Sequence, residues 1–283
     1  MSINTIGVIG SGLMGGGIAQ VCASIGRKVY LYDLEIGIIQ KRLDTIIKSL
    51  DKQIARRRID AQVKEAVSSN IIPTLDMNVM ADCDLIIEAV AEKLELKQSI
   101  FGKLDKICKP ETILASNTSS LPIVQIATAT NRPDRVVGAH FSQPVPSMKS
   151  LEIIRALPTS DETYNAIYQL ALDLNKVPVC SADVPGFISN RVLEIMVNEA
   201  ICCVYEGVGT IEDVDKLMTM CANFPMGPLT LADFIGLDTV LHIMEVMYKG
   251  YGDPKYRPCP LLRQYVDAGW LGRKTGRGFF VYD

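Results

Sequence analysis

The chain has 283 residues, of which 48% are hydrophobic and 22% charged, and its formal net charge is −3. A chain of this length can form one large domain or two smaller ones, and its hydrophobic content is sufficient for a buried core. The slightly negative charge argues against nucleic-acid binding, and no apolar run approaches the roughly 20 residues of a membrane span. We therefore expect a folded protein with neither a nucleic-acid nor a membrane partner.

The first half of the chain alternates short apolar runs with helical patterns. The run TIGVIG is apolar at most positions, as in a strand that is buried on both faces. Alternation of such strands with helices predicts a parallel sheet covered by helices on both sides. We expect strands at 5–10, 28–33, 83–90, 112–117, 135–141, 150–157 and 177–180, and helices at 13–26, 35–58, 94–108 and 161–175.

The pattern changes after Pro185-Gly186. Every later segment has apolar residues at helical spacing, which predicts helices at 188–207, 210–222, 229–248 and 259–269. Thr210 is expected to cap the second of these helices, because Glu212 and Asp213 follow in its first turn. We therefore predict two domains, an α/β domain at 1–184 and an all-α domain at 185–283.

The eight cysteines show no CxxC spacing and lie within apolar stretches. Disulfide frameworks and zinc sites use regular cysteine spacings, whereas reduced cysteines of intracellular proteins are commonly buried. The N-terminus leads directly into TIGVIG without the pattern of a secretion signal. We therefore expect buried, reduced thiols, a cytoplasmic location and no metal site.

The segment GSGLMG places Gly10, Gly12 and Gly15 in GxGxxG register between the first strand and the first helix, and the second strand ends at Asp33. This arrangement is typical of a Rossmann-type domain, in which the glycines permit a tight turn, close approach of a pyrophosphate and close helix packing. Asp33 would bind the adenine-ribose hydroxyls and repel a 2′-phosphate, which favours NAD over NADP. The alternative is a glycine-rich turn that binds no ligand.

Several motifs together resemble the 3-hydroxyacyl-CoA dehydrogenase family, in particular the short bacterial 3-hydroxybutyryl-CoA dehydrogenases. They are GVIGSGLMGGGIAQ, DLIIEAVAEKLELKQSIF, ILASNTSSL, GAHFSQPVPSMKSLEII, PGFISNR, NFPMGPLTLADFIGLD and GWLGRKTGRGFFVYD, which span nearly the whole chain. The resemblance implies NAD-dependent interconversion of (3S)-3-hydroxyacyl-CoA and 3-ketoacyl-CoA, with the short-chain 3-hydroxybutyryl-CoA as the expected substrate. It also implies a homodimer formed through the helical domain, with substrate in the cleft between the domains.

The resemblance assigns roles to individual residues. It implies a catalytic pair in His140 and Glu152, with Ser119 and Asn190 as polar substrate contacts. On the cofactor side it implies the glycine-turn residues Gly10, Gly12, Leu13, Met14 and Gly15, together with Asp33, Ala89, Glu92, Lys97 and Asn117. Further substrate contacts are implied for Ser49 and Arg56, which correspond to positions near CoA in relatives, and for Gln143.

The proposed chemistry requires these residue types. Oxidation of a secondary alcohol removes its proton while hydride leaves for the nicotinamide, and a neutral imidazole is suited to that proton transfer near pH 7. Glu152 would hold the other ring nitrogen of His140 and stabilise the imidazolium, as a carboxylate does in a catalytic triad. Ser119 would hydrogen-bond the substrate oxygen, and Asn190 would position the thioester carbonyl.

Each assignment also has a simpler structural alternative. Ser119 and Asn117 could be turn or capping residues, and Asn190 could be a surface residue. Glu92 could be an acidic residue favoured in the first turn of a helix, and Lys97 a solvated helix lysine.

The chain departs from the family after His140. Relatives commonly continue His-Phe-Phe-Asn-Pro, whereas this chain continues Phe141-Ser142-Gln143-Pro144. The change is either a neutral, coupled repacking or an altered pocket for a more polar acyl group. An acyl-carrier-protein thioester is a second possible substrate, because Arg56–Arg58 could contact an acidic carrier. A non-catalytic NAD-binding protein, as among lens crystallins, is a more distant alternative.

Overall fold

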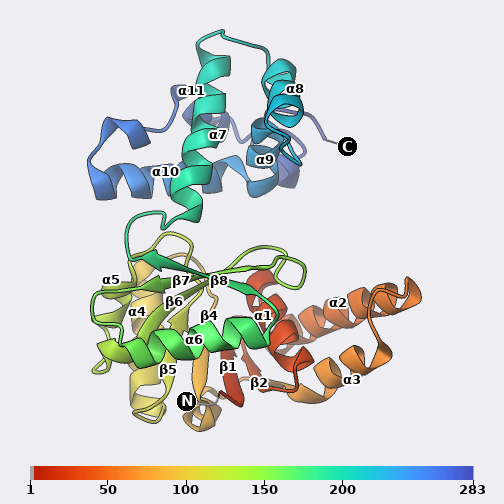
Figure 1. Cartoon of the computed structure of the whole chain (residues 1–283), viewed down its shortest axis with the longest axis vertical. Helices are drawn as coiled ribbons and strands as arrows, with labels where there is room; N and C mark the ends of the chain where they lie inside the picture. Colours follow the sequence, from red (N-terminus) through yellow and green to blue (C-terminus); the bar gives the residue numbers. More distant parts are fainter. Residues whose placement is uncertain (1–2, 283) are drawn as a thin grey trace. The chain divides into compact units, whose positions relative to one another are not determined.

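The computed structural model describes residues 3–282. The chain forms two compact units, Met1–Asp183 and Val184–Asp283, and Figure 1 shows a sheet with helices in the first and helices alone in the second. The α/β class of the first unit and the all-helical class of the second are as predicted from the sequence.

The first unit contains one eight-stranded sheet in the order β3-β2-β1-β4-β5-β6-β7-β8. Its strands are β1 (Thr5–Ile9), β2 (Lys28–Tyr32), β3 (Ile71–Thr74), β4 (Leu85–Glu88), β5 (Ile113–Ser116), β6 (Val136–Phe141), β7 (Ser150–Arg155) and β8 (Val177–Ala182). The chain proceeds from β1 to β2 and β3 on one side and then to β4, β5 and β6 on the other, so the carboxyl ends of β1 and β4 flank the position where doubly wound sheets bind ligands.

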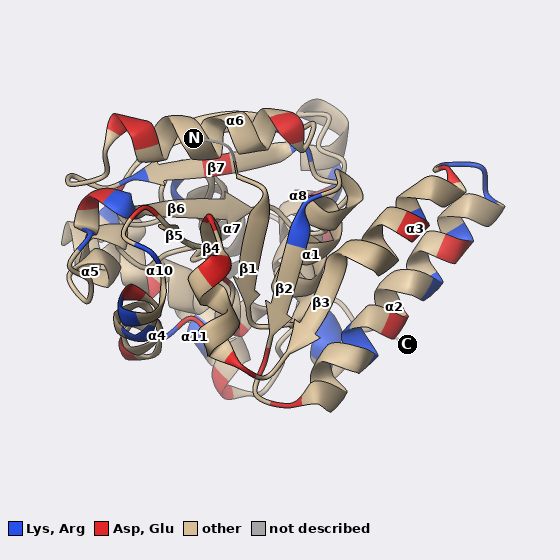
Figure 2. Cartoon of the chain, turned by 90° about the horizontal axis from the view of Figure 1, so that it is seen from below, with Lys and Arg blue, Asp and Glu red and all other residues tan. Residues whose placement is uncertain are grey.

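The helices of this unit are α1 (Leu13–Ser24), α2 (Ile36–Ala55), α3 (Ala61–Asn70), α4 (Leu94–Ile107), α5 (Ile123–Ala127) and α6 (Asp161–Asp173), with 3₁₀ turns η1 (Met77–Asp82) and η2 (Pro133–Arg135). The elements α3, α5 and β3 were not predicted from the sequence. Figure 2 shows α2 and α3 side by side, projecting beyond the β3 edge of the sheet, with basic residues in the loop that joins them. Of these two helices, α2 corresponds to the helix expected at 35–58, whereas α3 buries Val67 alone, which explains its weak sequence pattern.

The sheet is mixed rather than parallel throughout, so this part of the sequence prediction was wrong. Strand β7 runs antiparallel to β6, and β8 runs parallel to β7. The reason is the connection between β6 and β7, which contains no crossover helix; a parallel pair would require one. The antiparallel pairing sets His140 directly opposite Glu152.

The second unit consists of α7 (Ser189–Tyr205), α8 (Ile211–Cys221), α9 (Pro228–Ile235), α10 (Leu237–Tyr251) and α11 (Pro260–Asp267), with 3₁₀ turns η3 (Pro254–Tyr256) and η4 (Arg273–Thr275). Thr210 caps α8, since its side chain accepts the backbone N–H of Asp213. The single helix expected at 229–248 is instead two helices. Gly236 separates them with a φ of 102°, a conformation that a helix cannot contain.

The cysteines only partly match the expectation of burial. Cys22, Cys83, Cys108 and Cys259 are buried, Cys202 and Cys203 are partly buried, and Cys180 and Cys221 are exposed. Cys180 lies on β8, an edge strand, and Cys221 ends α8, so an apolar sequence context did not ensure burial. Within residues 3–282, no helix has both the length and the apolarity required to cross a membrane.

Candidate active site

The turn between β1 and α1 needs glycine for different reasons at its three positions. Gly10 has a φ of 96°, which disfavours other residues. A Cβ at Gly15 would lie 1.7 Å from the carbonyl oxygen of Gly10, so this position requires glycine for packing. A Cβ at Gly12 would meet no atom within 4 Å, and its φ of −59° suits any residue. The protein itself therefore gives no reason for glycine at position 12, but a ligand seated against the turn would.

Asp33, just after β2, is held in place by the same turn. Its Oδ2 accepts the backbone N–H of Ser11 at 2.7 Å and the Ser11 hydroxyl at 2.6 Å, and its Oδ1 accepts the N–H of Leu34 at 2.8 Å. Burial opposes ionisation of this carboxyl, but the donors of Ser11 and Leu34 outweigh it and lower the pKa of Asp33. A fixed carboxylate therefore lies beside the glycine turn.

A pocket of about 390 Å³ opens at this turn, and we name it the glycine-turn pocket. Of the residues expected at a cofactor, Gly10, Gly12, Asp33 and Ala89 line it. The sequence analysis missed several other lining residues, including Leu34, Val90, Ser99 and Lys103. Ser99 and Lys103 are one turn apart on α4, the helix that follows β4. Their helical spacing could have indicated that both face the same pocket.

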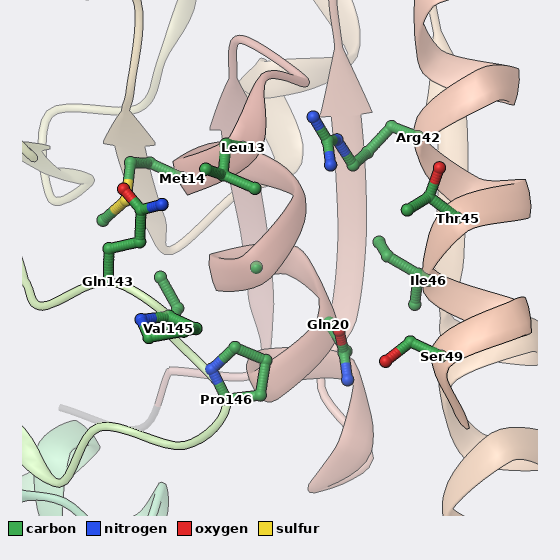
Figure 3. Close-up of a pocket in the computed structure, with 12 residues that line it drawn as sticks. Leu13, Met14, Gln20, Arg42, Thr45, Ile46, Ser49, Gln143, Val145 and Pro146 are labelled. Atoms are coloured by element: carbon green, nitrogen blue, oxygen red, sulfur yellow. The ribbon is translucent and has the colours of Figure 1, made fainter. Parts of the chain in front are cut away.

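Leu13 and Met14, also expected at the cofactor, instead line a second pocket of about 180 Å³, the α1–α2 pocket. Figure 3 shows its walls: α1 with Gln20, α2 with Arg42, Thr45, Ile46 and Ser49, and the loop with Gln143, Val145 and Pro146. Two expected substrate contacts, Ser49 and Gln143, thus meet in one pocket. The third, Arg56, is exposed at the end of α2 and does not line it.

Arg42 is the charged residue of the α1–α2 pocket that sequence reasoning missed. Its Nε donates to the backbone oxygen of Ser11 at 3.2 Å, and its aliphatic stem lies against Gly16, where a Cβ would come within 2.4 Å. Arg42 and Ser49 are seven residues apart and lie on the same face of α2. Arg42 therefore shares a helix face with Ser49, which the family resemblance implies as a substrate contact.

His140 and Glu152 meet across β6 and β7. The Nδ1 atom of His140 lies 3.1 Å from Oε2 of Glu152, with both side chains largely buried. Because the two residues are directly paired in the antiparallel ladder, they lie on the same face of the sheet. The backbone register thus places the two side chains together, and the contact between Nδ1 and Oε2 orients the imidazole ring.

Ser119 lies in a turn organised by one carboxylate. Oε1 of Glu92 accepts the Thr118 hydroxyl at 2.6 Å, the N–H of Ser119 at 2.9 Å and the N–H of Ser120 at 3.0 Å. The hydroxyls of Ser119 and Ser120 also lie within 3.4 Å of it. Glu92 is therefore more than a first-turn helix acid, and the Ser119 turn is built around it.

Lys97 is not the solvated helix lysine of the simpler alternative. Its side chain is 1% exposed, and its Nζ lies 2.7 Å from Oε1 of Glu88, at the end of β4, and 3.4 Å from Oε2 of Glu92. Glu88 also accepts the hydroxyl of Ser116, at the end of β5, at 2.7 Å. A buried ionic network thus joins two strand ends to the Ser119 turn.

Asn117 and Asn190 lie in different units. Asn117 follows β5 and accepts the N–H of Phe141, the residue after His140, at 2.9 Å, so it braces the end of β6. Asn190 lies in the first turn of α7, in the second unit.

The two departures from the family motif have different surroundings. The hydroxyl of Ser142, just past β6, lies 3.0 Å from that of Ser150 on β7, so Ser142 has a hydrogen-bond partner within the protein. Gln143 is exposed and lines the α1–α2 pocket. The coupled-repacking interpretation fits Ser142, and the altered-pocket interpretation fits Gln143. Residues 3–282 contain no cluster of histidine, cysteine and acidic side chains that could hold a metal.

Comparison with known proteins gives a consistent answer for both units. Residues 5–184 match the family model of the 3-hydroxyacyl-CoA dehydrogenase NAD-binding domain, and residues 186–282 match the C-terminal domain of the same enzymes. The chain belongs to the 3-hydroxyacyl-CoA dehydrogenase family.

Individual members of the family are similar over their full length. A probable 3-hydroxybutyryl-CoA dehydrogenase of Bacillus subtilis is 52% identical, covering 100% of this chain and 99% of the relative. A 3-hydroxybutyryl-CoA dehydrogenase of Bradyrhizobium diazoefficiens is 48% identical over 99% of this chain and 96% of the relative. The crystal structure of the (S)-3-hydroxybutyryl-CoA dehydrogenase of Ralstonia eutropha covers all of both chains, with a TM-score of 0.97 and 44% identity.

Proposed function

We propose that this chain is an NAD-dependent 3-hydroxyacyl-CoA dehydrogenase that interconverts short-chain (3S)-3-hydroxyacyl-CoA and 3-ketoacyl-CoA. The observation that carries the proposal is the His140–Glu152 pair, fixed by strand register in a chain that matches the family in both domains. 3-Hydroxybutyryl-CoA is the expected substrate, because relatives that match over their full length carry that name.

The residues of the glycine-turn pocket fit NAD. The open space in front of Gly12 is where the pyrophosphate would lie, and the Asp33 carboxylate suits ribose hydroxyls but would repel a 2′-phosphate. When bound, NAD supplies the hydride acceptor for the alcohol, and NADH supplies the donor for the ketone. The protein contributes binding and alignment.

His140 is proposed to exchange the proton through its Nε2 atom. With Nδ1 directed at Glu152, the carboxylate fixes the tautomer and stabilises the imidazolium that forms when the substrate hydroxyl loses its proton. In the reverse direction, the imidazolium returns the proton to the 3-keto oxygen. Ser119 would hydrogen-bond that oxygen and Asn190 the thioester carbonyl, roles that follow from the family resemblance.

The α1–α2 pocket is the proposed place for the pantetheine arm of the thioester. Met14, Val145 and Pro146 give it apolar walls, and Ser49 and Gln143 provide polar groups. Arg56, exposed at the end of α2, would meet the outer part of the substrate. We further propose a homodimer through the helical domain and a cytoplasmic location, which rest on the family resemblance and the cysteine usage.

A carrier-protein thioester is the second candidate substrate. It is favoured by the exposure of Arg56, Arg57 and Arg58, a basic cluster that an acidic carrier could contact. Turnover of acetoacetyl-CoA should be compared with that of acetoacetyl-carrier protein and of ketoacyl-CoA esters with polar chain ends. The main proposal predicts the highest kcat/KM for acetoacetyl-CoA. A carrier-bound substrate that is used far more efficiently would favour the alternative.

A further inference from the structure

The ammonium group of Lys97 is fully occupied within the protein. Its three hydrogens face three oxygens within 3.5 Å: Oε1 of Glu88 at 2.7 Å, Oε2 of Glu92 at 3.4 Å and the carbonyl of Val90 at 3.5 Å. The side chain is 1% exposed. A lysine so enclosed directs its ammonium group at oxygens of the protein, although the resemblance places it on the cofactor side.

Glu88 forms the fixed end of this network. It is fully buried at the end of β4, and its Oε1 accepts the N–H of Val90 at 2.7 Å as well as the Lys97 ammonium. Its Oε2 accepts the hydroxyl of Ser116, which is its partner in the parallel β4–β5 ladder. Lys97 is therefore attached to a buried carboxylate that is hydrogen-bonded across two neighbouring strands of the sheet.

Glu92 forms the other end and is less buried, with 26% of its side chain exposed. Burial is the largest single influence and opposes ionisation, but the Lys97 charge and the donors of Thr118, Ser119 and Ser120 together lower the pKa of Glu92. The ionised form is the one that accepts the backbone N–H groups of Ser119 and Ser120.

We infer that Lys97 is a positioning residue: anchored on Glu88, it holds the Glu92 carboxylate, and this carboxylate holds the 118–120 turn so that Ser119 meets the substrate oxygen. The inference deepens the proposed function and rests on it, because the placement of Ser119 affects catalysis only if Ser119 contacts the substrate. Its distinctive consequence is that Lys97 affects the chemical step rather than the binding of NAD.

The test compares Lys97→Met with Lys106→Met, which removes an exposed lysine from the same helix. NADH dissociation constants and kcat with acetoacetyl-CoA are measured from pH 6 to pH 9, and each variant is expressed relative to wild type. We expect an NADH dissociation constant close to wild type for both variants. For Lys97→Met the relative kcat should be about 10–100-fold lower at pH 6, the scale of a misplaced catalytic contact.

The relative kcat of Lys97→Met should then rise with pH. Loss of the ammonium removes the largest of the influences that lower the pKa of Glu92, so more of the carboxyl is protonated at the acidic end of the range and the turn is held less well there. A purely structural defect would not recover with pH. A weaker NADH affinity together with a pH-independent relative kcat would show that Lys97 contributes to cofactor binding and would overturn the inference. A wild-type kcat at every pH would also overturn it.

Glu92→Gln keeps the test decisive if Lys97→Met fails to fold. This partly exposed position should accept the amide, and we expect a lowered kcat, an unchanged NADH affinity and no pH dependence of the relative rate. Lys97→Gln is made both alone and in the Glu92→Gln background, where it should cost little more, because residues that act in series are not additive. If the losses of kcat in the two single variants add fully in the double variant, Lys97 does not act through Glu92. Inactivity of the wild type with every thioester would refute the proposed function itself.

Discussion

The two pockets beside α1 are built in different ways. At the glycine-turn pocket, the glycines and the pinned Asp33 carboxylate lie within the short segment Gly10–Asp33, and residues between Met77 and Lys103 complete the lining. The α1–α2 pocket is assembled from side chains of α1, α2 and the 143–146 loop, which are far apart in the sequence. The φ of Gly10 and the close packing of Gly15 therefore restrict the turn of the first pocket to glycine at these two positions, whereas the second pocket can be altered one side chain at a time. We expect the choice of cofactor to be fixed by the glycine-turn pocket and the choice of acyl substrate to be adjustable through the α1–α2 pocket.

The largest effect is expected outside both pockets. His140→Ala should lower kcat by roughly 10²–10⁴-fold, the usual contribution of a general acid–base group. The affinity for NADH should hardly change, because His140 lines neither pocket. Steady-state kinetics and NADH titration check this pair of outcomes, and a variant with near wild-type kcat would remove His140 from the mechanism.

Gly12→Ala should show that the glycine turn is shaped for a ligand. The added methyl group meets no protein atom, so thermal stability should stay close to wild type. It would occupy the space of the pyrophosphate, and NADH should bind about 10–100-fold more weakly, as expected for displacement by about 1 Å. Gly15→Ala is the matched contrast, because its methyl group would strike the Gly10 carbonyl and destabilise the fold. Undiminished NADH binding by Gly12→Ala would argue against a pyrophosphate at this turn.

Asp33→Ala should relax the choice between NADH and NADPH. Loss of a carboxylate that binds ribose hydroxyls costs about 1–2 kcal/mol for NADH, or roughly tenfold, and removes the repulsion of a 2′-phosphate. The ratio of kcat/KM for the two cofactors measures this change. The ratio would stay at its wild-type value if Asp33 did not face the ribose.

Arg42→Met tests the α1–α2 pocket and should have the smallest effect. If Arg42 contacts a phosphate of CoA, the KM for acetoacetyl-CoA should rise about fivefold, the scale of a partly exposed ion pair, while the KM for acetoacetyl-pantetheine stays constant. Lys41→Met, which removes the exposed neighbouring charge, is the control. Equal changes for both thioesters would exclude a phosphate contact, and a change in the NADH KM alone would assign Arg42 to the cofactor.

A similar contrast, between local patterns and long-range arrangement, explains which parts of the fold could be predicted from the sequence. The strands of the buried sheet and the amphipathic helices were predictable, because periodicity records which faces are buried. The α3 and β3 elements were missed because they bury little. The antiparallel β7 was missed because strand direction depends on the connection, which leaves no trace in the pattern of one strand.

In the site, local motifs were informative and long-range contacts were not. Gly10, Gly12, Gly15 and Asp33 could be interpreted chemically from their spacing. The burial of Lys97 between Glu88 and Glu92 could not, because it requires β4, β5 and α4 to be placed together. Arg42 was missed because its partners, Ser11 and Gly16, lie on another element.

The most direct test of the central claim is isotope transfer. (3S)-3-Hydroxybutyryl-CoA carrying deuterium at C3 is incubated with wild-type protein and NAD, and the NADH formed is analysed by mass spectrometry. The proposed function predicts one deuterium in each NADH, because the hydride comes from C3 of the alcohol. Unlabelled NADH, or no reduction of NAD, would contradict it.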